Sequence, residues 1–120
     1  MIDQDTIKEL NVVRHFLDEK KAEDVAVIDV AETSPFASYI VIATCSNPRS
    51  LGAYMDQLED ELYKNKIEVS VKEGEPDSGW VIVQGQDVLV HLMLPGNRRM
   101  INLEELLERI KNKHHKAELE

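Results

Sequence analysis

Apolar residues recur at helical spacing in three stretches of the chain. In residues 3–20, 48–65 and 102–110, apolar side chains lie three or four positions apart, which is typical of amphipathic helices. Each stretch therefore predicts a helix. Each also has a helix-start signal at or near its first residue. The signals are Thr6 with Glu9, Asn47 with Pro48, and Asn102 with Glu105.

Five short apolar runs lie between these helices and are rich in β-branched residues, which favour strands. They span residues 24–30, 38–44, 67–71, 80–84 and 87–94. The first two are nearly continuous in apolar side chains, which indicates buried strands. The turn-rich segment "GEPDSG" predicts a hairpin between the third and fourth runs, while the second helix provides a crossover between the second and third.

The predicted order is helix, strand, strand, helix, strand, strand, strand, helix. This order favours the α/β class, with a mixed sheet of about five strands, helices packed on it and a nucleotidyltransferase-like topology. A chain of 120 residues with 42% hydrophobic content is expected to form one domain. We place the domain at residues 1–113 and a frayed tail at residues 114–120.

The charge of the chain is strongly negative, with a formal net value of −9. Residues 98–120 carry six Lys or Arg and five Glu, whereas residues 1–97 carry eight basic and eighteen acidic side chains. Because nucleic-acid binding depends on basic side chains against phosphates, little direct nucleic-acid contact is expected. A basic protein partner is favoured instead.

Cellular location is indicated by the absence of certain segments. No run approaches the roughly 20 apolar residues that span a bilayer, and the acidic start "MIDQDTIKEL" does not resemble a targeting signal. A single cysteine, Cys45, excludes an internal disulfide and any CxxC pair. We expect a cytoplasmic protein, or an already processed form, that does not contact membranes.

The nucleotidyltransferase-like order calls for a search for catalytic carboxylates. Nucleotidyl transfer needs carboxylates that converge on metal ions, usually two positions apart on a strand. Asp24 and Asp29 are five apart and would point to opposite faces, while Asp87 is expected to cap a turn. The loop "TCSNPRS", residues 44–50, lacks phosphate-binding glycines. We therefore expect no enzyme, catalytic residue or cofactor; the alternative is nucleotide binding or residual nucleotidyl transfer at this loop.

Metal and thiol chemistry are equally poorly supported. His15, His91, His114 and His115 show no metal-ligand spacing with one another or with Cys45. A helix dipole after Cys45 would make its thiol reactive, but a small buried hydrophobe at a strand end is the favoured interpretation. No metal site is expected.

Two interpretations of Trp80 and His91 remain open. Both side chains are suited to a core, where polar atoms of aromatic residues find hydrogen-bond partners. Strand alternation gives the other interpretation. If Val88, Val90, Leu92 and Leu94 face the core helices, then Leu89, His91 and Met93 lie on the opposite face, beside Trp80. That combination of side chains is typical of a protein interface.

Several segments occur in a recognisable order. They are "KKAEDVAVIDV", "SYIVIAT", a polar loop ending in Arg49, Trp80 before "DVLVHLMLP", and Arg98 before "NLEELL". In this order, and in the distance from Trp80 to Asp-Val-x-Val-His, the chain resembles the Iojap-related ribosomal silencing factors. The similarity extends from about Val12 to Ile110. Two departures are Ile101, where an aromatic residue is expected, and Leu107, where a tryptophan is expected.

The resemblance implies a non-enzymatic protein with a nucleotidyltransferase-like mixed sheet. It implies binding to the large ribosomal subunit through the ribosomal protein numbered fourteen, a steric block to joining of the small subunit, and repression of translation under nutrient limitation. A homodimer is also expected. We predict a partner-binding surface made by eight residues, Trp80, His91, Met93, Leu94, Pro95, Arg98, Arg99 and Met100.

Overall fold

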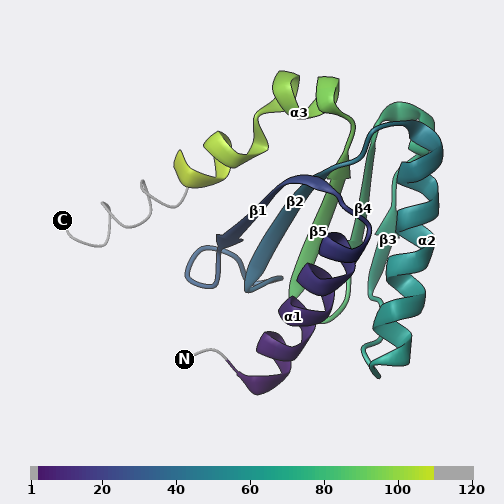
Figure 1. Ribbon diagram of the computed structural model, residues 1–120. Helices are drawn as coiled ribbons and strands as arrows, with labels where there is room; N and C mark the ends of the chain where they lie inside the picture. The colour runs from purple at the N-terminus through teal and green to yellow at the C-terminus, as the bar shows by residue number, and fades with distance from the viewer. Residues whose placement is uncertain (1–2, 110–120) are drawn as a thin grey trace.

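A computed structural model describes residues 3–109 of the chain, which form helices and one group of adjacent strands (Figure 1). A helical stretch at residues 103–109 ends the described part. The predicted frayed tail, residues 114–120, lies outside the described residues. The other elements are α1 (Gln4–Glu19), β1 (Glu23–Asp29), β2 (Tyr39–Thr44), α2 (Pro48–Lys64), β3 (Val71–Glu73), the 3-10 helix η1 (Pro76–Ser78), β4 (Trp80–Gln84), β5 (Val88–Met93) and α3 (Pro95–Ile101).

The five strands within residues 3–109 form one mixed sheet in the order β1-β2-β5-β4-β3. Only β2 and β5 are parallel, and the other three neighbouring pairs are antiparallel. The parallel pair is made possible by the crossover through α2, and β3 and β4 form the expected hairpin. The predicted fold class, a mixed sheet of about five strands with packed helices, is confirmed.

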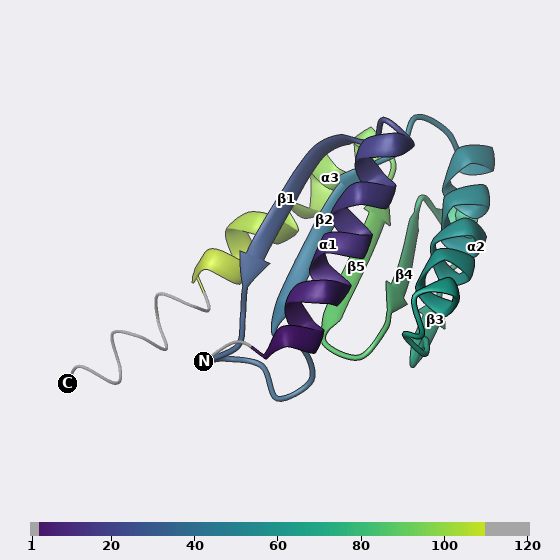
Figure 2. The same cartoon turned by 60° about the horizontal axis from the view of Figure 1, so that its bottom comes forward.

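Helices cover the two faces of the sheet unequally. α1 and α2 lie on one face, whereas the C-terminal helical segment, which comprises α3 and residues 103–109, lies on the other, next to β1 and β2 (Figures 1 and 2). The first face carries the larger core, in which Leu17 from α1 and Leu58 from α2 pack against Val41 and Val90. A second, smaller core joins Ile28, Ile40, Ile42 and Met93 to residues of the C-terminal segment.

The predicted capping box at the start of α1 is wrong. Asp3 caps the helix instead, since its Oδ1 accepts the Asp5 N–H at 2.7 Å. Thr6 and Glu9 are buried and serve the turn between β4 and β5. The Thr6 hydroxyl donates to Asp87 Oδ2 at 2.6 Å, and the Glu9 carboxylate accepts N–H groups from three successive turn residues, Gln86, Asp87 and Val88, at 2.8–2.9 Å.

The start of α2 is as predicted. Asn47 has an extended backbone and its Oδ1 accepts the Ser50 N–H at 2.9 Å, while Pro48 occupies the first helical position. The helix ends at Lys64 with Asn65 as its cap. Its buried stripe consists of Leu51, Met55, Leu58 and Leu62.

Two of the strand predictions need correction. β1 was expected to be buried, but it is an edge strand and most of its side chains are exposed. The run at residues 67–71 was expected to be a strand, but β3 begins only at Val71. The chain before it is still leaving α2, with the Ile67 N–H bonded to the Leu62 carbonyl and the Ile67 side chain buried in the larger core.

The segment "PGNRRMI" is a helix, α3, although its Pro-Gly-Asn start reads as a loop. Leu94 is its cap residue and Pro95 occupies the first helical position. Asn102 ends it in the left-handed conformation, with φ 43°. The predicted third helix then starts as expected, because Asn102 Oδ1 accepts the Glu105 N–H.

Within residues 3–109, no helix is long and apolar enough to cross a membrane.

Candidate partner-binding surface

The side chains of β5 alternate between the two faces of the sheet, as the sequence predicts. Val88, Val90 and Leu92 are fully buried in the larger core beneath α1 and α2. Leu89 and Met93 belong to the second core on the opposite face. His91 lies between them in the alternation, so it shares their face.

Trp80 and His91 are diagonal neighbours across the antiparallel pair β4–β5, in which Trp80 is opposite Met93 and His91 is opposite Ile82. The indole Nε1 of Trp80 donates to His91 Nδ1 at 2.9 Å, and the two rings lie 5.7 Å apart. His91 is 7% exposed, whereas Trp80 is only partly buried. The pair therefore has a buried histidine held by a tryptophan that still reaches solvent.

The protonation of His91 follows from this environment. Burial lowers the pKa of His91 from its ordinary value of 6.5 to about 4. Because Nδ1 accepts the bond from Trp80, the neutral ring carries its proton on Nε2. At neutral pH the pair is an uncharged donor–acceptor unit.

Met93 is fully buried, with no exposed surface. It packs with Ile28, Ile40 and Ile42, and residues of the C-terminal segment lie over this cluster. Ile101 and Leu107, where the resemblance led us to expect aromatic side chains, are two of those covering residues. Substitution at these two positions therefore affects the packing of the C-terminal segment on the sheet.

Arg98 makes two hydrogen bonds within the chain. Its Nε donates to Glu104 Oε1 and its Nη1 to Thr44 Oγ1, both at 2.8 Å, and its side chain is only 12% exposed. The guanidinium therefore connects α3 and the following helix to the end of β2. Arg99, the next residue, is exposed.

The other predicted site residues lie around the end of β5. Leu94 is partly buried against the larger core, and its N–H donates to the Gly79 carbonyl at 2.9 Å. Pro95 is exposed, and Met100 is 86% exposed. Of the eight predicted residues, Pro95, Arg99 and Met100 are thus the most accessible to a partner.

An open, polar pocket of about 650 Å³ lies next to these residues. It is found where β2 ends and α3 begins, and its walls carry both carboxylates and guanidinium groups. The lining residues are Glu23, Asp24, Thr44, Pro95, Arg98, Arg99, Asn102 and Glu104.

Phe36 is an exposed aromatic residue that the sequence analysis did not single out. It lies in the loop between β1 and β2 and is 80% exposed. Its backbone carbonyl accepts a hydrogen bond from Gln84 Nε2 at 2.8 Å. Gln84 shares the face of Trp80 by alternation along β4, so Phe36 adds an apolar group at the far end of that face.

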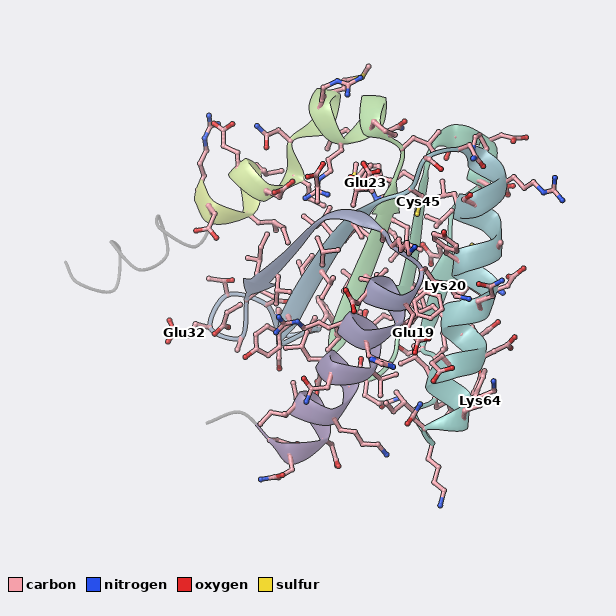
Figure 3. The ribbon with its side chains drawn as sticks, viewed as in Figure 1. Glu19, Lys20, Glu23, Glu32, Cys45 and Lys64 are labelled. Carbon is pink, nitrogen blue, oxygen red and sulfur yellow. The ribbon has the colours of Figure 1, made fainter. Side chains whose placement is uncertain are left out.

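The residues considered for catalysis are placed in structural roles. Cys45 lies at the end of β2 (Figure 3) and is buried, which raises the pKa of its thiol to about 11. Asp87 accepts the Thr6 hydroxyl, while Glu9 provides the turn cap expected of Asp87. Among residues 3–109, no group of three or more His, Cys, Asp or Glu side chains is placed to hold a metal ion. His114 and His115 lie outside the described residues.

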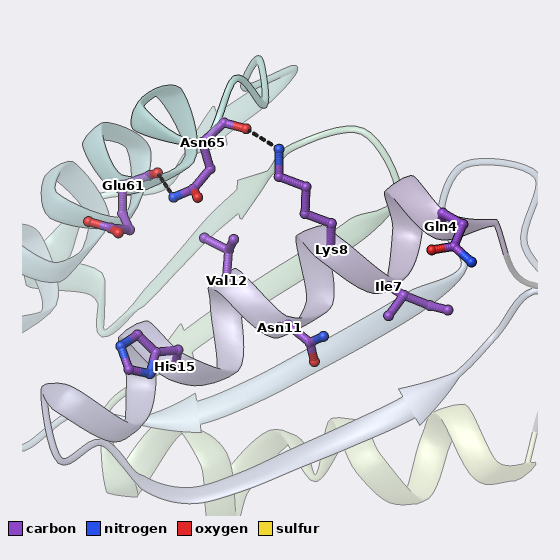
Figure 4. Close-up of a pocket in the computed structure, with 8 residues that line it drawn as sticks. All are labelled: Gln4, Ile7, Lys8, Asn11, Val12, His15, Glu61 and Asn65. Atoms are coloured by element: carbon purple, nitrogen blue, oxygen red, sulfur yellow. Dashed lines mark hydrogen bonds between the residues drawn. The ribbon is translucent and has the colours of Figure 1, made fainter.

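A separate groove of about 480 Å³ runs between α1 and α2 (Figure 4). At one end Lys8 Nζ donates to the Asn65 carbonyl at 2.8 Å, and Asn65 Nδ2 donates to the Glu61 carbonyl at 2.9 Å. These bonds satisfy carbonyl groups at the C-terminus of α2. The groove is on the side of the sheet that α1 and α2 cover, and none of the predicted site residues lines it.

Comparison with known proteins gives consistent results. The family model described as "Ribosomal silencing factor during starvation" matches residues 3–120. The ribosomal silencing factor RsfS of Zymomonas mobilis is 34% identical over 97 residues, covering 81% of this chain and 73% of that protein. The RsfS protein of Bacillus subtilis is 31% identical over 97 residues, covering 81% of this chain and 82% of that protein.

Solved structures agree with the fold. The crystal structure of protein CV0518 from Chromobacterium violaceum has a TM-score of 0.80, with 23% identity and 86% of both chains covered. A structure from Bacillus halodurans has a TM-score of 0.73, with 26% identity, covering 82% of this chain and 92% of that one.

Proposed function

Because this chain belongs to the family of ribosomal silencing factors, we propose that it binds the large ribosomal subunit and blocks joining of the small subunit. The contact is made through the ribosomal protein numbered fourteen. Translation is thereby repressed when nutrients are limiting. The protein acts by occupying a surface and catalyses no reaction.

The observation that carries the proposal is the unequal covering of the second sheet face. The C-terminal helical segment packs over the part formed by β1 and β2. On the β4 side, Trp80 and Ile82 are only partly buried, as is Leu89 on β5. A partly exposed tryptophan among aliphatic side chains is typical of the centre of a protein interface.

Exposed side chains at both ends extend this surface. Phe36 lies at the end marked by Gln84, and Pro95, Arg99 and Met100 follow the end of β5. Arg99 supplies an exposed guanidinium fork that suits carboxylates or backbone carbonyls of a partner. Met93 and Arg98 support the surface from within the fold, since both are engaged in intramolecular contacts.

The charge of the chain supports a basic partner. Its net charge of −9 favours association with a positively charged ribosomal protein and disfavours extensive contact with RNA phosphates. A cytoplasmic location follows from a role on the ribosome, and the homodimer remains a prediction, testable by light scattering at several concentrations.

Co-sedimentation with purified large subunits at low salt tests the proposal. The chain should comigrate with large subunits, and its addition should reduce the light scattering that accompanies subunit joining. An Arg99→Ala, Met100→Ala double variant should bind more weakly. The matched control is Arg14→Ala, Tyr63→Ala, which removes an exposed arginine and a large exposed side chain from α1 and α2.

The experiment tests the proposed function and the proposed binding surface separately. If the unaltered chain fails to comigrate at low salt, the proposed function is wrong. If it comigrates but the Arg99, Met100 variant binds as tightly as the control variant, the function stands and the binding surface lies elsewhere.

A further inference from the structure

The two edges of the sheet differ in their protection. β3 is only three residues long, and Lys72 on it forms ion pairs with Asp56 and Glu59 of α2 at 2.7 and 2.9 Å. β1, at the other edge, is seven residues long, and within residues 3–109 no strand pairs with its outer side. Short, charged edges resist pairing with another chain, whereas long ones invite it.

The backbone groups on the outer side of β1 can be assigned from the pairing register. The Val30 N–H donates to the Ser38 carbonyl at 2.9 Å, and Ile28 and Ile40 are partners in the same antiparallel register. Since bonded positions alternate in an antiparallel pair, Ile28 directs its N–H and C=O groups towards β2, as Val30 directs its N–H. The Val30 carbonyl accepts N–H groups from Thr33 and Ser34 in the following loop. The groups of Val27 and Asp29 therefore point outward.

A partly apolar groove accompanies this free edge. It has a volume of about 420 Å³ and lies between α1 and β1. Val25 and Val27 are 43% and 38% exposed, and they line the groove together with Ala22, Arg14, His15 and Asp18. A strand added beside β1 would direct alternate side chains into this groove.

Charge distinguishes between the occupants that could pair with this edge. β1 itself carries Glu23, Asp24 and Asp29 and no lysine or arginine, and none of these three carboxylates is in an ion pair within residues 3–109. Residues 14–32 hold six carboxylates against three Lys or Arg. Glu23 and Glu32 lie towards opposite ends of the strand (Figure 3).

A second copy of the chain fits this edge poorly. Antiparallel pairing of β1 with β1 of another copy would bring three strand carboxylates from each chain into one interface. Like charges placed opposite each other across a strand pair are destabilising. A strand that carries lysine or arginine would instead be attracted to the carboxylates of β1.

We propose that the β1 edge binds an extended peptide segment of a partner protein, in which lysine or arginine alternates with small apolar residues. The segment adds to the sheet as a sixth strand by hydrogen bonding to Val27 and Asp29. Its apolar side chains enter the groove against Val25 and Val27. Its basic side chains point to the opposite face, where they meet Glu23 and Asp24. This binding mode is backbone pairing with charge selection, and it does not depend on the proposed ribosome-binding function.

The probe is a synthetic six-residue peptide of alternating lysine and valine with blocked ends. NMR of the isotope-labelled chain should show slowed hydrogen exchange at the Val27 and Asp29 amides, which gain partners. The Ile28 amide is already bonded to β2 and serves as the internal control. A peptide with glutamate in place of lysine, and one with N-methylated backbone, should not bind.

Two matched double variants test the role of charge. Glu23→Gln, Asp24→Asn removes the two carboxylates that the basic side chains would meet, and asparagine tolerates the positive φ of 49° at position 24. Peptide affinity should fall by roughly 2- to 20-fold, the range expected for two exposed ion pairs. The control, Asp60→Asn, Glu75→Gln, makes the same charge change at exposed sites on α2 and before η1 and should leave affinity unchanged.

A separate variant tests the backbone pairing. Val27→Pro removes an outward N–H without removing a bond to β2 and should abolish peptide binding; retention of the remaining β1–β2 amide protection shows that the strand still forms. The proposal is overturned if the basic peptide does not bind, if the acidic peptide binds equally well, if the affected amides lie around Trp80 and Leu89, or if Val27 and Asp29 become protected by self-association alone.

Discussion

Glu9 and Val88 lie 79 positions apart in the sequence, yet the buried carboxylate of Glu9 accepts the Val88 N–H at 2.8 Å. The same carboxylate accepts the N–H groups of Gln86 and Asp87. A residue of the first helix thereby fixes the turn that leads into the central strand β5. Gly85 permits this approach, since a Cβ there would lie 2.8 Å from Glu9 Oε2.

Replacing Glu9 by alanine should be strongly destabilising. Three N–H groups would lose their acceptor in a largely buried site, and each such loss costs roughly 1–3 kcal/mol. We expect a decrease of about 3–5 kcal/mol in the free energy of unfolding, measured by urea denaturation. Glu19→Ala, at an exposed site on the same helix, should change stability by less than about 0.5 kcal/mol; similar losses in the two variants would contradict the assigned role of Glu9.

The depressed pKa of His91 predicts a dependence of stability on pH. The folded-state pKa of about 4 lies below the unfolded value of about 6.5, so the unfolded chain binds more protons between these values. The contribution of His91 is complete above pH 6.5 and disappears as the pH falls towards 4. It should amount to about 3 kcal/mol, measured as the difference in pH dependence between the unaltered chain and His91→Gln.

Trp80 gives a second measurement of the same titration. It is the single tryptophan of the chain and donates directly to His91, so its fluorescence should change when His91 becomes protonated. The midpoint should lie near pH 4 in the folded chain. A midpoint near pH 6.5, or an unchanged titration in His91→Gln, would show that the imidazole is not buried against Trp80.

The two methionines of the predicted site should behave differently. Met93 is fully buried and Met100 is 86% exposed. Met93→Ala should lower the free energy of unfolding by about 2–5 kcal/mol, as truncations in a core do. Met100→Ala should change it by less than about 0.5 kcal/mol, and equal losses on denaturation would contradict the position assigned to the C-terminal segment.

Trp80 should contribute to partner binding more than to the fold. If the proposed surface is correct, Trp80→Ala weakens binding to large subunits by about 1–4 kcal/mol. Trp80→Phe retains most of the apolar area but loses the bond to His91, so its binding should be intermediate. Binding loss should exceed the loss in unfolding free energy of the same variants; a loss confined to stability would place Trp80 among the core residues.

The bond between Arg98 and Thr44 should be measurable as a coupling energy. The guanidinium Nη1 donates to Thr44 Oγ1 at 2.8 Å, which ties α3 to the end of β2. A double-mutant cycle with Arg98→Ala and Thr44→Ala should give about 0.5–1.5 kcal/mol. A coupling indistinguishable from zero would mean that the contact does not hold the two elements together.

Local signals determined which elements were predictable. Asn47 and Pro48 act on the first turn of α2 alone, so the helix start can be read from the sequence. The same logic failed at Thr6 and Glu9, because their spacing matches a capping box while their partners lie in a turn far along the chain. α3 was missed because contacts from elsewhere support its Pro-Gly-Asn start, including the Asn97 Nδ2 bond to the Ser78 carbonyl.

The candidate surface was predictable in part for the same reason. Alternation along β5 placed His91 and Met93 correctly on the face opposite α1 and α2. It could not show that the C-terminal segment would cover Met93 and leave Trp80 partly open, since that depends on where Ile101 and Leu107 pack. Nor can a β-branched run distinguish the edge strand β1 from a buried one.

The strand order has a consequence for the synthesis of the chain. Among the strands of residues 3–109, β5 is the last to be made but occupies the middle of the sheet. Until residue 93 has emerged, β1–β2 and β3–β4 are two separate antiparallel pairs with no strand between them, and the turn that Glu9 holds does not yet exist. Pairings over such long sequence separations form slowly. The nascent chain therefore exposes the inner edges of both pairs until the central strand is complete.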